Sequence, residues 1–219
     1  MIKKLVLLIF AALLAVLFLL NLVAFFGCHE QFLPLASWLP FALGFVLYAL
    51  VACAFCKFLG WDFGFAITFV HELNHTVFAA LHLRKVSSFN AHESKGGEMT
   101  YAGKPTPLIA LAPYSVPLVS LPLLPISALV VESAAPWVAG AVGFTLAFHF
   151  HSLKHDFHLG QTDLYIFGLP FSLAFILWLN SVLVPSIAVA ATFSFSRLLD
   201  FWLAIFAFYK DFVLSIISG

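Results

Sequence analysis

Residues 71–75 of this chain read His-Glu-Leu-Asn-His and combine three side chains that together can do metal chemistry. On an α-helix, His71 and His75 lie on one face because they are four residues apart, so both imidazoles can bind one metal ion. Glu72 lies beside this pair, where its carboxylate can take a proton from a metal-bound water molecule. The residue types and their spacing therefore predict a zinc site with Glu72 as the general base.

The surroundings of this motif strengthen the prediction. Residues 63–83 are otherwise apolar enough to form a membrane helix. An ionisable side chain at bilayer depth costs on the order of 3 kcal/mol on insertion scales, so three such groups in one turn need a compensating ligand. The structural alternative is a polar trio that lines a water-filled gap between helices. We favour the metal site because the His-Glu-x-x-His pattern is specific for zinc binding.

Composition assigns the chain to the membrane proteins. Hydrophobic residues make up 63% of its 219 residues and charged residues 9%, and the mean hydropathy of +1.07 lies far outside the range of soluble domains. Ten basic and ten acidic residues cancel, and the absence of a basic run argues against nucleic-acid binding. Cys53 and Cys56 lie in an uncharged stretch and indicate helix packing rather than a redox pair.

Apolar runs of about 20 residues, the length that crosses a bilayer, define the elements that must position the motif. We expect an all-α polytopic membrane protein with six or seven transmembrane helices and no soluble domain. The expected segments are 5–26, 39–58, 63–83, 107–131, 137–152, 164–184 and 186–208, with Pro185 as the break between the last two. The first segment is too long for a signal-peptide core and is expected to be retained. Residues 1–219 form one membrane domain, in which 1–58 and 186–219 are accessory helices.

Two segments next to the motif interrupt the apolar pattern. Residues 84–104 are polar, and short strands at 86–89 and 98–101 around Gly96-Gly97 predict a β-hairpin beside the metal, with a plain surface loop as the alternative. Residues 107–131 hold five prolines. Interior prolines break the helical ladder and leave carbonyls free, so we expect a kinked, partly unwound helix next to a cavity.

The motif and its neighbours together resemble the site-2 protease family of intramembrane zinc metalloproteases. The matching residues lie between about 63 and 180, and they are His71-Glu72-Leu73-Asn74-His75, Ala79-Ala80, Arg84-Lys85-Val86, Gly96-Gly97 and Leu111-Ala112-Pro113-Tyr114. The resemblance implies a three-helix core and a hairpin that re-enters the membrane. The edge strand of that hairpin would hold an extended substrate, here through Gly97, Glu98, Met99, Thr100 and Tyr101.

The third zinc ligand is where the chain departs from the family pattern, which supplies an Asp from a Leu-Asp-Gly motif. The nearest equivalent is Gln161-Thr162-Asp163-Leu164, and we favour Asp163 as the ligand. His149, which lies on the expected helix, is the alternative and would complete a three-His site. His151, Asp156 and His158 are more remote candidates. We expect one zinc ion per chain, with water as the fourth ligand.

The resemblance implies metal-assisted hydrolysis of peptide bonds in or near a transmembrane segment of another membrane protein, in a bacterial cytoplasmic membrane. Two other functions stay open. One is a metal-binding relative without proteolytic activity, and the other is a transporter whose intramembrane His and Glu side chains relay ions or protons. The oligomeric state is open.

Basic residues give conflicting signals about membrane orientation. Lys3 and Lys4 favour a cytoplasmic N-terminus, whereas Arg84, Lys85, Lys95 and Lys104 favour a cytoplasmic hairpin. With two full spans before the helix that carries the motif, the N-terminus and the hairpin fall on opposite sides. Either one early segment does not fully cross, or one of the two charge signals misleads. We give more weight to the larger cluster.

Overall fold

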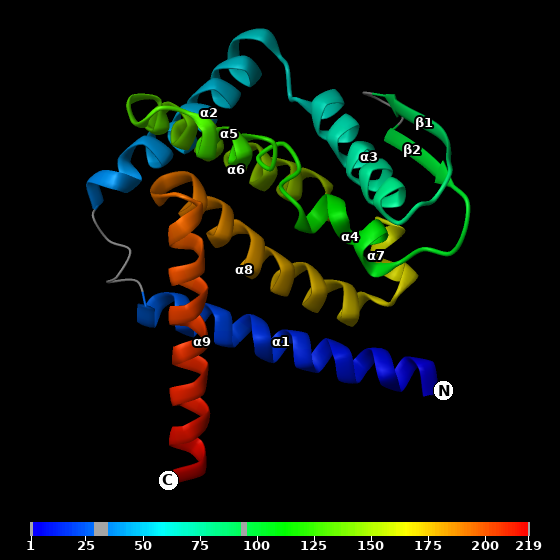
Figure 1. Ribbon diagram of the computed structural model, residues 1–219. Helices are drawn as coiled ribbons and strands as arrows, with labels where there is room; N and C mark the ends of the chain where they lie inside the picture. The colour runs from blue at the N-terminus through cyan, green and yellow to red at the C-terminus, as the bar shows by residue number, and fades with distance from the viewer. Residues whose placement is uncertain (1, 29–34, 93–95, 219) are drawn as a thin grey trace.

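A computed structural model describes residues 2–28, 35–92 and 96–218, so Lys95 lies outside the described residues. The longer helices are α1 (Ile2–Cys28), α2 (Leu35–Leu59), α3 (Gly64–Leu81), α6 (Ala135–Asp156), α8 (Leu169–Phe193) and α9 (Phe195–Ser218). Shorter elements are α4 (Pro107–Ser115), α5 (Leu123–Leu129), a 3₁₀ turn η2 (Glu132–Ala134) and α7 (Asp163–Ile166). Strands β1 (Val86–His92) and β2 (Gly96–Tyr101) form an antiparallel pair (Figure 1).

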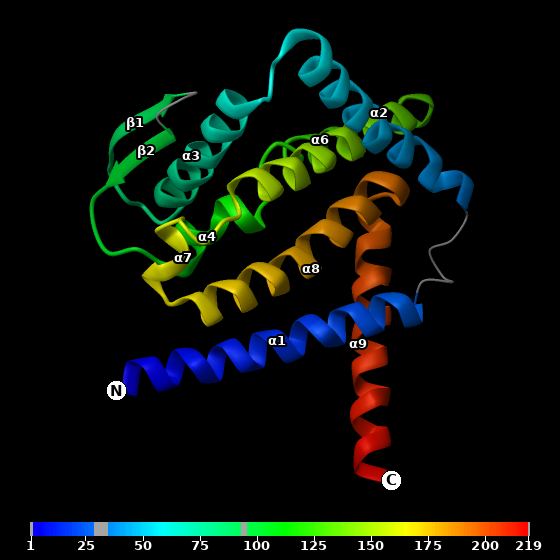
Figure 2. The same ribbon diagram turned by 180° about the vertical axis from the view of Figure 1, so that it is seen from behind.

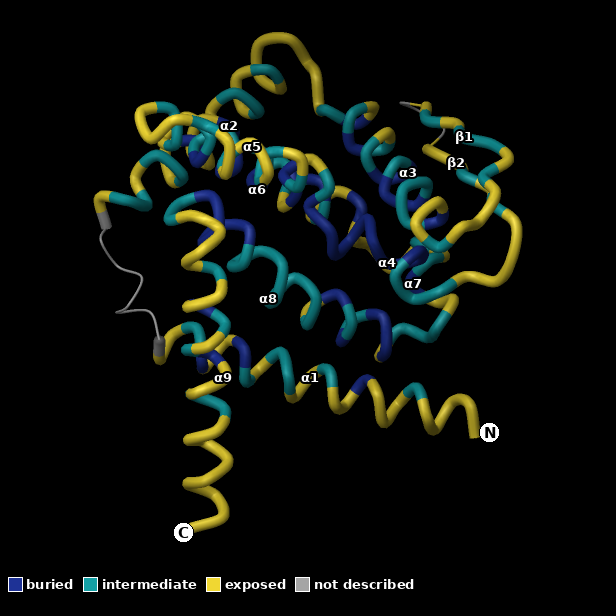
Figure 3. The backbone as a smooth tube through the Cα atoms, in the orientation of Figure 1, coloured by how far each residue is buried: buried dark blue, intermediate teal, exposed yellow. Residues whose placement is uncertain are grey.

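Helices α1, α2, α6, α8 and α9 are long and apolar enough to cross a membrane, which supports a multi-pass membrane protein. Much of their surface is exposed and apolar, in keeping with contact to lipid (Figure 3). Among the described residues, therefore, five helices meet this requirement, where the sequence predicted six or seven. The difference arises in 63–83 and 107–131, which do not form long apolar helices.

Helices α1, α6 and α8 pack side by side, so their ends define two ends of the molecule. Ala11 of α1 packs with Phe171 of α8, and Ala24 packs with Val189, so α1 and α8 run parallel. Helix α6 runs the other way, because its His149 meets Asn180 of α8 while Val142, earlier in α6, lies in one core cluster with Ile187, later in α8. We call the end where α1 and α8 begin the site end; α3, α7 and the hairpin lie there in both views (Figures 1 and 2).

Glycines allow α2 and α6 to touch backbone to backbone. A Cβ atom on Gly44 of α2 would lie 1.8 Å from the carbonyl oxygen of Gly140, and one on Gly143 of α6 would lie 2.0 Å from the oxygen of Phe41. No side chain larger than hydrogen fits at such a distance, which is how small residues bring membrane helices together. The two helices run parallel, since Tyr48 further along α2 bonds to His151 of α6.

Helix α3 stays at the site end instead of crossing the bundle. The Phe63 ring just before α3 lies 6.2 Å from that of His151, and Nδ1 of His71 lies 3.0 Å from Asp156, the last residue of α6. Helix α2 has therefore returned the chain to the site end before α3 begins. The N-terminus of α1 and the hairpin consequently lie at the same end of the molecule. With α3 outside the five candidate spans, Lys3 and Lys4 lie at the same end as the described Arg84, Lys85 and Lys104, and the two charge signals agree.

The β-hairpin after α3 is confirmed, but its glycines lie elsewhere than predicted. Gly96 and Gly97 begin β2, where they pair with His92 and Ala91 of β1, and so are not between the strands. A Cβ atom on Gly97 would lie 2.4 Å from Cγ of Glu72, so glycine lets the strand approach α3 without displacing the Glu72 side chain. The Phe89 ring of β1 also packs edge-on against Phe69 of α3.

The proline-rich segment is broken into α4 and α5, as the five prolines predicted. Thr106 caps α4 by accepting a hydrogen bond from the Ile109 backbone N–H, and Pro107 occupies the first turn, where its missing N–H has no cost. Residues 116–122 form no regular helix between the two short ones. Leu123 and Leu124 pack against α6 and α8 at the far end, so this segment leads the chain away from the site end.

The predicted break at Pro185 is wrong. Helix α8 continues through Pro185 to Phe193, and the chain turns at Ser194, whose φ of 125° is outside the helical range. A proline inside a membrane helix is tolerated when neighbouring groups and packed helices compensate. Here the buried Ile187 and Val189 pack against α6, α1 and α9 and hold the helix in place. In α9, Arg197 and Asp200 form an ion pair at 3.3 Å.

Candidate metal centre

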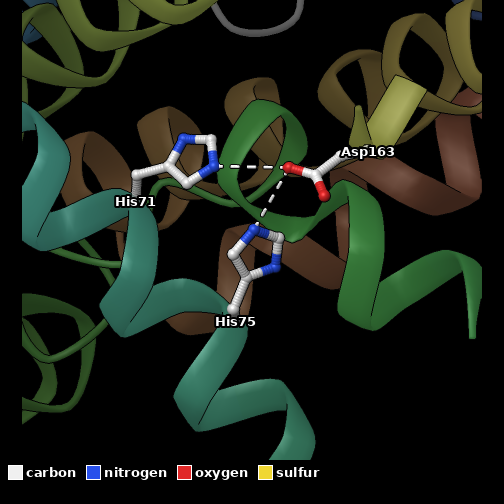
Figure 4. A group of neighbouring side chains, drawn as sticks. All are labelled: His71, His75 and Asp163. Atoms are coloured by element: carbon white, nitrogen blue, oxygen red, sulfur yellow. Dashed lines mark ion pairs between the residues drawn. The ribbon is translucent and has the colours of Figure 1, made fainter. Parts of the chain in front are cut away.

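Three side chains meet at the site end with their potential ligand atoms turned toward one another (Figure 4). Nε2 of His71 lies 3.5 Å from Oδ2 of Asp163, and Nε2 of His75 lies 3.3 Å from the same oxygen. Both histidines are buried on α3, and Asp163 opens α7 from the connection between α6 and α8. The structure thus brings together the histidine pair and the favoured third residue.

The other ring nitrogens of the two histidines are already engaged. Nδ1 of His71 donates to Oδ2 of Asp156 at 3.0 Å, and Nδ1 of His75 donates to the carbonyl oxygen of Ile109 at 2.7 Å. Since both partners are acceptors, each Nδ1 carries a proton, and in the neutral form of either histidine Nε2 presents a lone pair. This is the arrangement of metal-binding histidines, whose second nitrogen is held by a carboxylate or a backbone carbonyl.

The donor set fits a divalent cation. When both histidines are neutral, two nitrogen lone pairs and a carboxylate oxygen face one another and repel unless a cation lies between them. A tetrahedral zinc ion with bonds of about 2.0 Å places its ligand atoms about 3.3 Å apart. The contacts of 3.3 and 3.5 Å to Asp163 agree with that spacing. His71, His75 and Asp163 would therefore hold such an ion, leaving one position for water.

Burial and charge act in opposite directions on Asp163. Burial alone would raise the pKa of its carboxyl, but when no metal ion is bound, hydrogen bonds and charges of the protonated His71 and His75 rings outweigh this effect and hold the pKa below the ordinary value. Asp163 is therefore ionised at neutral pH, which is the form that binds a metal ion.

The proline-rich helix α4 supplies the bond that orients His75. Pro113 has no N–H, so the carbonyl of Ile109, four residues earlier, has no helical partner. Nδ1 of His75 takes that place. The free carbonyls expected from the prolines thus have a specific role in the site.

Tyr114 fixes the other side of the centre. Its side chain is fully buried, its ring packs edge-on against His71, and its hydroxyl donates to Oδ2 of Asp163 at 3.4 Å. Nδ2 of Asn180 donates to the Tyr114 carbonyl at 2.8 Å, which ties α4 to α8. Gly168, with a φ of 89°, makes the turn from α7 into α8 that leaves Asp163 facing α3.

Glu72 borders a cavity of about 320 Å³ next to the histidines. The cavity lies between α3, the start of β2 and the end of α6, and its walls include Thr68, Gly97 and His158. Every side chain that lines it is polar, apart from the two glycines of β2. Water can therefore reach Glu72 and His71 from this side.

The remaining predicted residues divide into two groups. Gly97, Met99 and Tyr101 share the face of β2 that turns to α3, whereas the exposed Glu98 and Thr100 point the other way. His149 does not join the three ligand candidates.

His149 is buried, and its Nε2 lies 3.1 Å from Oδ1 of Asn180, so it links α6 to α8 behind the centre. Among the described residues, His71, His75 and Asp163 are the group of His, Cys, Asp or Glu side chains placed to share a metal ion.

Sequence reasoning did not find the roles of Asp156 and Tyr114. Asp156 was considered as a metal ligand, but it bonds to His71 with one oxygen and to Nδ1 of His155 with the other. No local sequence pattern indicates the contact between Asp156 and His71, because the two residues are 85 positions apart. Tyr114 is one of the residues that match the site-2 protease family, but the match assigns it no role.

Comparison of the chain with known protein families, with curated protein sequences and with solved structures finds no match.

Proposed function

We propose that this membrane protein is a zinc metallopeptidase that hydrolyses peptide bonds of other membrane proteins, as its resemblance to the site-2 protease family implies. The observation that carries the proposal is the convergence of two Nε2 atoms and one carboxylate oxygen, each histidine being oriented through Nδ1. A polar cavity next to this centre, bordered by Glu72, provides space for a peptide.

Each residue has a distinct part in the proposed reaction. A zinc ion at His71, His75 and Asp163 would supply a Lewis acid that acidifies water and polarises a peptide carbonyl. The Glu72 carboxylate takes a proton from the attacking water and later delivers it to the leaving amine. Gly97 brings the β2 backbone against Glu72, where β2 can pair with an extended substrate strand.

The arrangement favours hydrolysis over ion transport. A proton or ion relay through a membrane spreads ionisable groups over the depth of the bilayer. Here His71, Glu72, His75, Asp156 and Asp163 gather at one end of α6 and α8. A metal-binding relative without activity would have the same cluster, so cleavage itself must separate these two functions.

The test is replacement of Glu72 by Gln, which keeps the size of the side chain but cannot accept the proton. Purified protein is incubated with a panel of tagged single-span membrane proteins, and products are followed by immunoblotting with zinc analysis alongside. Loss of a general base reduces the rate by about 10²–10⁴-fold, while zinc should stay bound because Glu72 is not a ligand. Glu132→Gln, at the far end, is the matched control. Equal cleavage by wild type and Glu72→Gln would refute the catalytic role.

A further inference from the structure

The candidate centre lies at the ends of the membrane helices instead of midway along them. Asp156, which contacts His71, is the last residue of the candidate span 132–156. Asp163 lies in the connection before the next candidate span begins at Leu169. Helix α3 lies beside residues 145–156 of α6, and His71 and His75 reach Asp156 and Asp163 at the end of that stretch.

The polarity of the cavities agrees with a position of the centre at the ends of the membrane helices. The cavity next to Glu72 is lined by polar side chains such as Thr68, His158 and Gln161. The larger cavities among the membrane helices, of about 380 and 620 Å³, are lined mainly by Phe, Leu, Trp and Pro side chains. An apolar peptide would lose its favourable burial in the polar cavity, whereas polar residues keep hydrogen-bond partners there.

Basic residues concentrate at the same end. Lys3 and Lys4 begin α1, Lys57 ends α2, and Arg84, Lys85 and Lys154 flank the hairpin and the end of α6. Short segments rich in Lys and Arg next to membrane helices remain on the cytoplasmic side. The far end carries Glu132 in η2 and, at the start of α9, Arg197 paired with Asp200.

We propose that the centre opens at the cytoplasmic surface of the membrane and takes as substrate a polar, extended segment next to a membrane anchor. This inference rests on the proposed peptidase function and specifies its substrate. The scissile bond then lies in the juxtamembrane residues, where a peptide is already extended and hydrated. Cleavage does not require a helix to unwind inside the bilayer.

The first test concerns location and does not depend on activity. Cys28, Cys53 and Cys56 are replaced by Ser, and single cysteines are introduced as His158→Cys, Leu47→Cys or Glu132→Cys. Membrane vesicles of either orientation are treated with a thiol reagent that cannot cross the membrane. We expect His158→Cys to react only in inside-out vesicles, Glu132→Cys only in right-side-out vesicles, and Leu47→Cys, midway along α2, in neither. Protection of His158→Cys in both orientations, or reaction only from outside, would overturn the proposal.

The second test concerns the substrate and uses two single-span reporter proteins. One carries a polar, flexible cytoplasmic stretch directly after its apolar segment. In the other, this stretch is replaced by a continuation of the apolar segment, and cleavage sites are mapped by mass spectrometry. We expect Glu72-dependent cleavage within the polar stretch and loss of cleavage in the second reporter. Cleavage inside the apolar segment would refute the inference but not the peptidase function. If neither reporter is cut and His158→Cys reacts as expected, the peptidase function fails while the location stands.

Discussion

Nδ1 of His75 donates a hydrogen bond of 2.7 Å to the carbonyl oxygen of Ile109, a carbonyl that Pro113 leaves without its helical partner. A local property of one helix thereby orients a side chain of another. The same principle applies to His71, whose Nδ1 is held by Asp156 of α6. Both histidines are thus preorganised by groups from outside α3, which lowers the cost of binding a metal ion.

Replacement of Pro113 by Ala should weaken metal binding. Alanine restores an N–H that can bond to Ile109 within α4 and so competes with His75 for this carbonyl. Loss of an orienting partner typically costs about 10–100-fold in metal affinity, and we expect the lower end because a carbonyl can accept two bonds. Zinc affinity is measured by competition with a chelator. Pro125→Ala in α5, far from the centre, is the control, and an unchanged affinity of Pro113→Ala would contradict this role.

Asp156→Ala should weaken zinc binding as well, by about 10–100-fold, because His71 loses the carboxylate that fixes its ring and tautomer. The same chelator competition measures the effect. Asp211→Ala, on the exposed part of α9, provides a control for removal of one acidic side chain. If Asp156→Ala binds zinc as tightly as wild type, the contact between Asp156 and His71 has no part in the centre.

Gly97→Ala should reduce cleavage while leaving zinc bound. The added Cβ would lie 2.4 Å from Cγ of Glu72 and 2.5 Å from its Oε1, so the carboxylate must move. Displacement of a catalytic group by about 1 Å costs on the order of 10²-fold in rate. Asn90→Ala in β1, which faces away from α3, serves as the control in the same cleavage assay. Normal activity of Gly97→Ala would show that Glu72 does not act from this position.

Gly44→Ala should destabilise the packing of α2 on α6 far more than Gly140→Ala. A Cβ atom at Gly44 would lie 1.8 Å from a backbone oxygen, whereas one at Gly140 meets its nearest neighbour at 3.3 Å. The helices must separate in the first variant, at a cost of about 1–3 kcal/mol. Thermal unfolding in detergent measures the difference, and equal midpoints for the two variants would contradict the close contact.

Much of the fold could be predicted from local patterns. The helices at 5–26, 39–58 and 137–152, the hairpin and the broken proline-rich segment all follow from apolar runs and turn residues, and the structure contains them. Pro185 was misleading because contacts of α8 with α1, α6 and α9 hold the helix together, and such contacts do not appear in a local pattern. Apolar length alone predicts that the segment 63–83 crosses the membrane, because a helix that stays at one end has the same length and composition.

The candidate site could be predicted in part for a similar reason. His71, Glu72 and His75 are adjacent in sequence, and their spacing alone places them together. Asp163 was favoured through the resemblance to a known family, and the structure places it against both histidines. Asp156, Ile109 and Tyr114 contact the centre only through the packing of α6 and α4 on α3, and no short-range pattern marks such residues.

The zinc content of purified protein tests the central claim most directly. Wild type is compared with His75→Ala, Asp163→Ala and His149→Ala, the last being a buried histidine outside the proposed centre. We predict about one zinc ion per chain in wild type and His149→Ala, and loss of zinc from His75→Ala and Asp163→Ala. Equal zinc in wild type and His75→Ala, or loss of zinc from His149→Ala with Asp163→Ala unaffected, would contradict the centre formed by His71, His75 and Asp163.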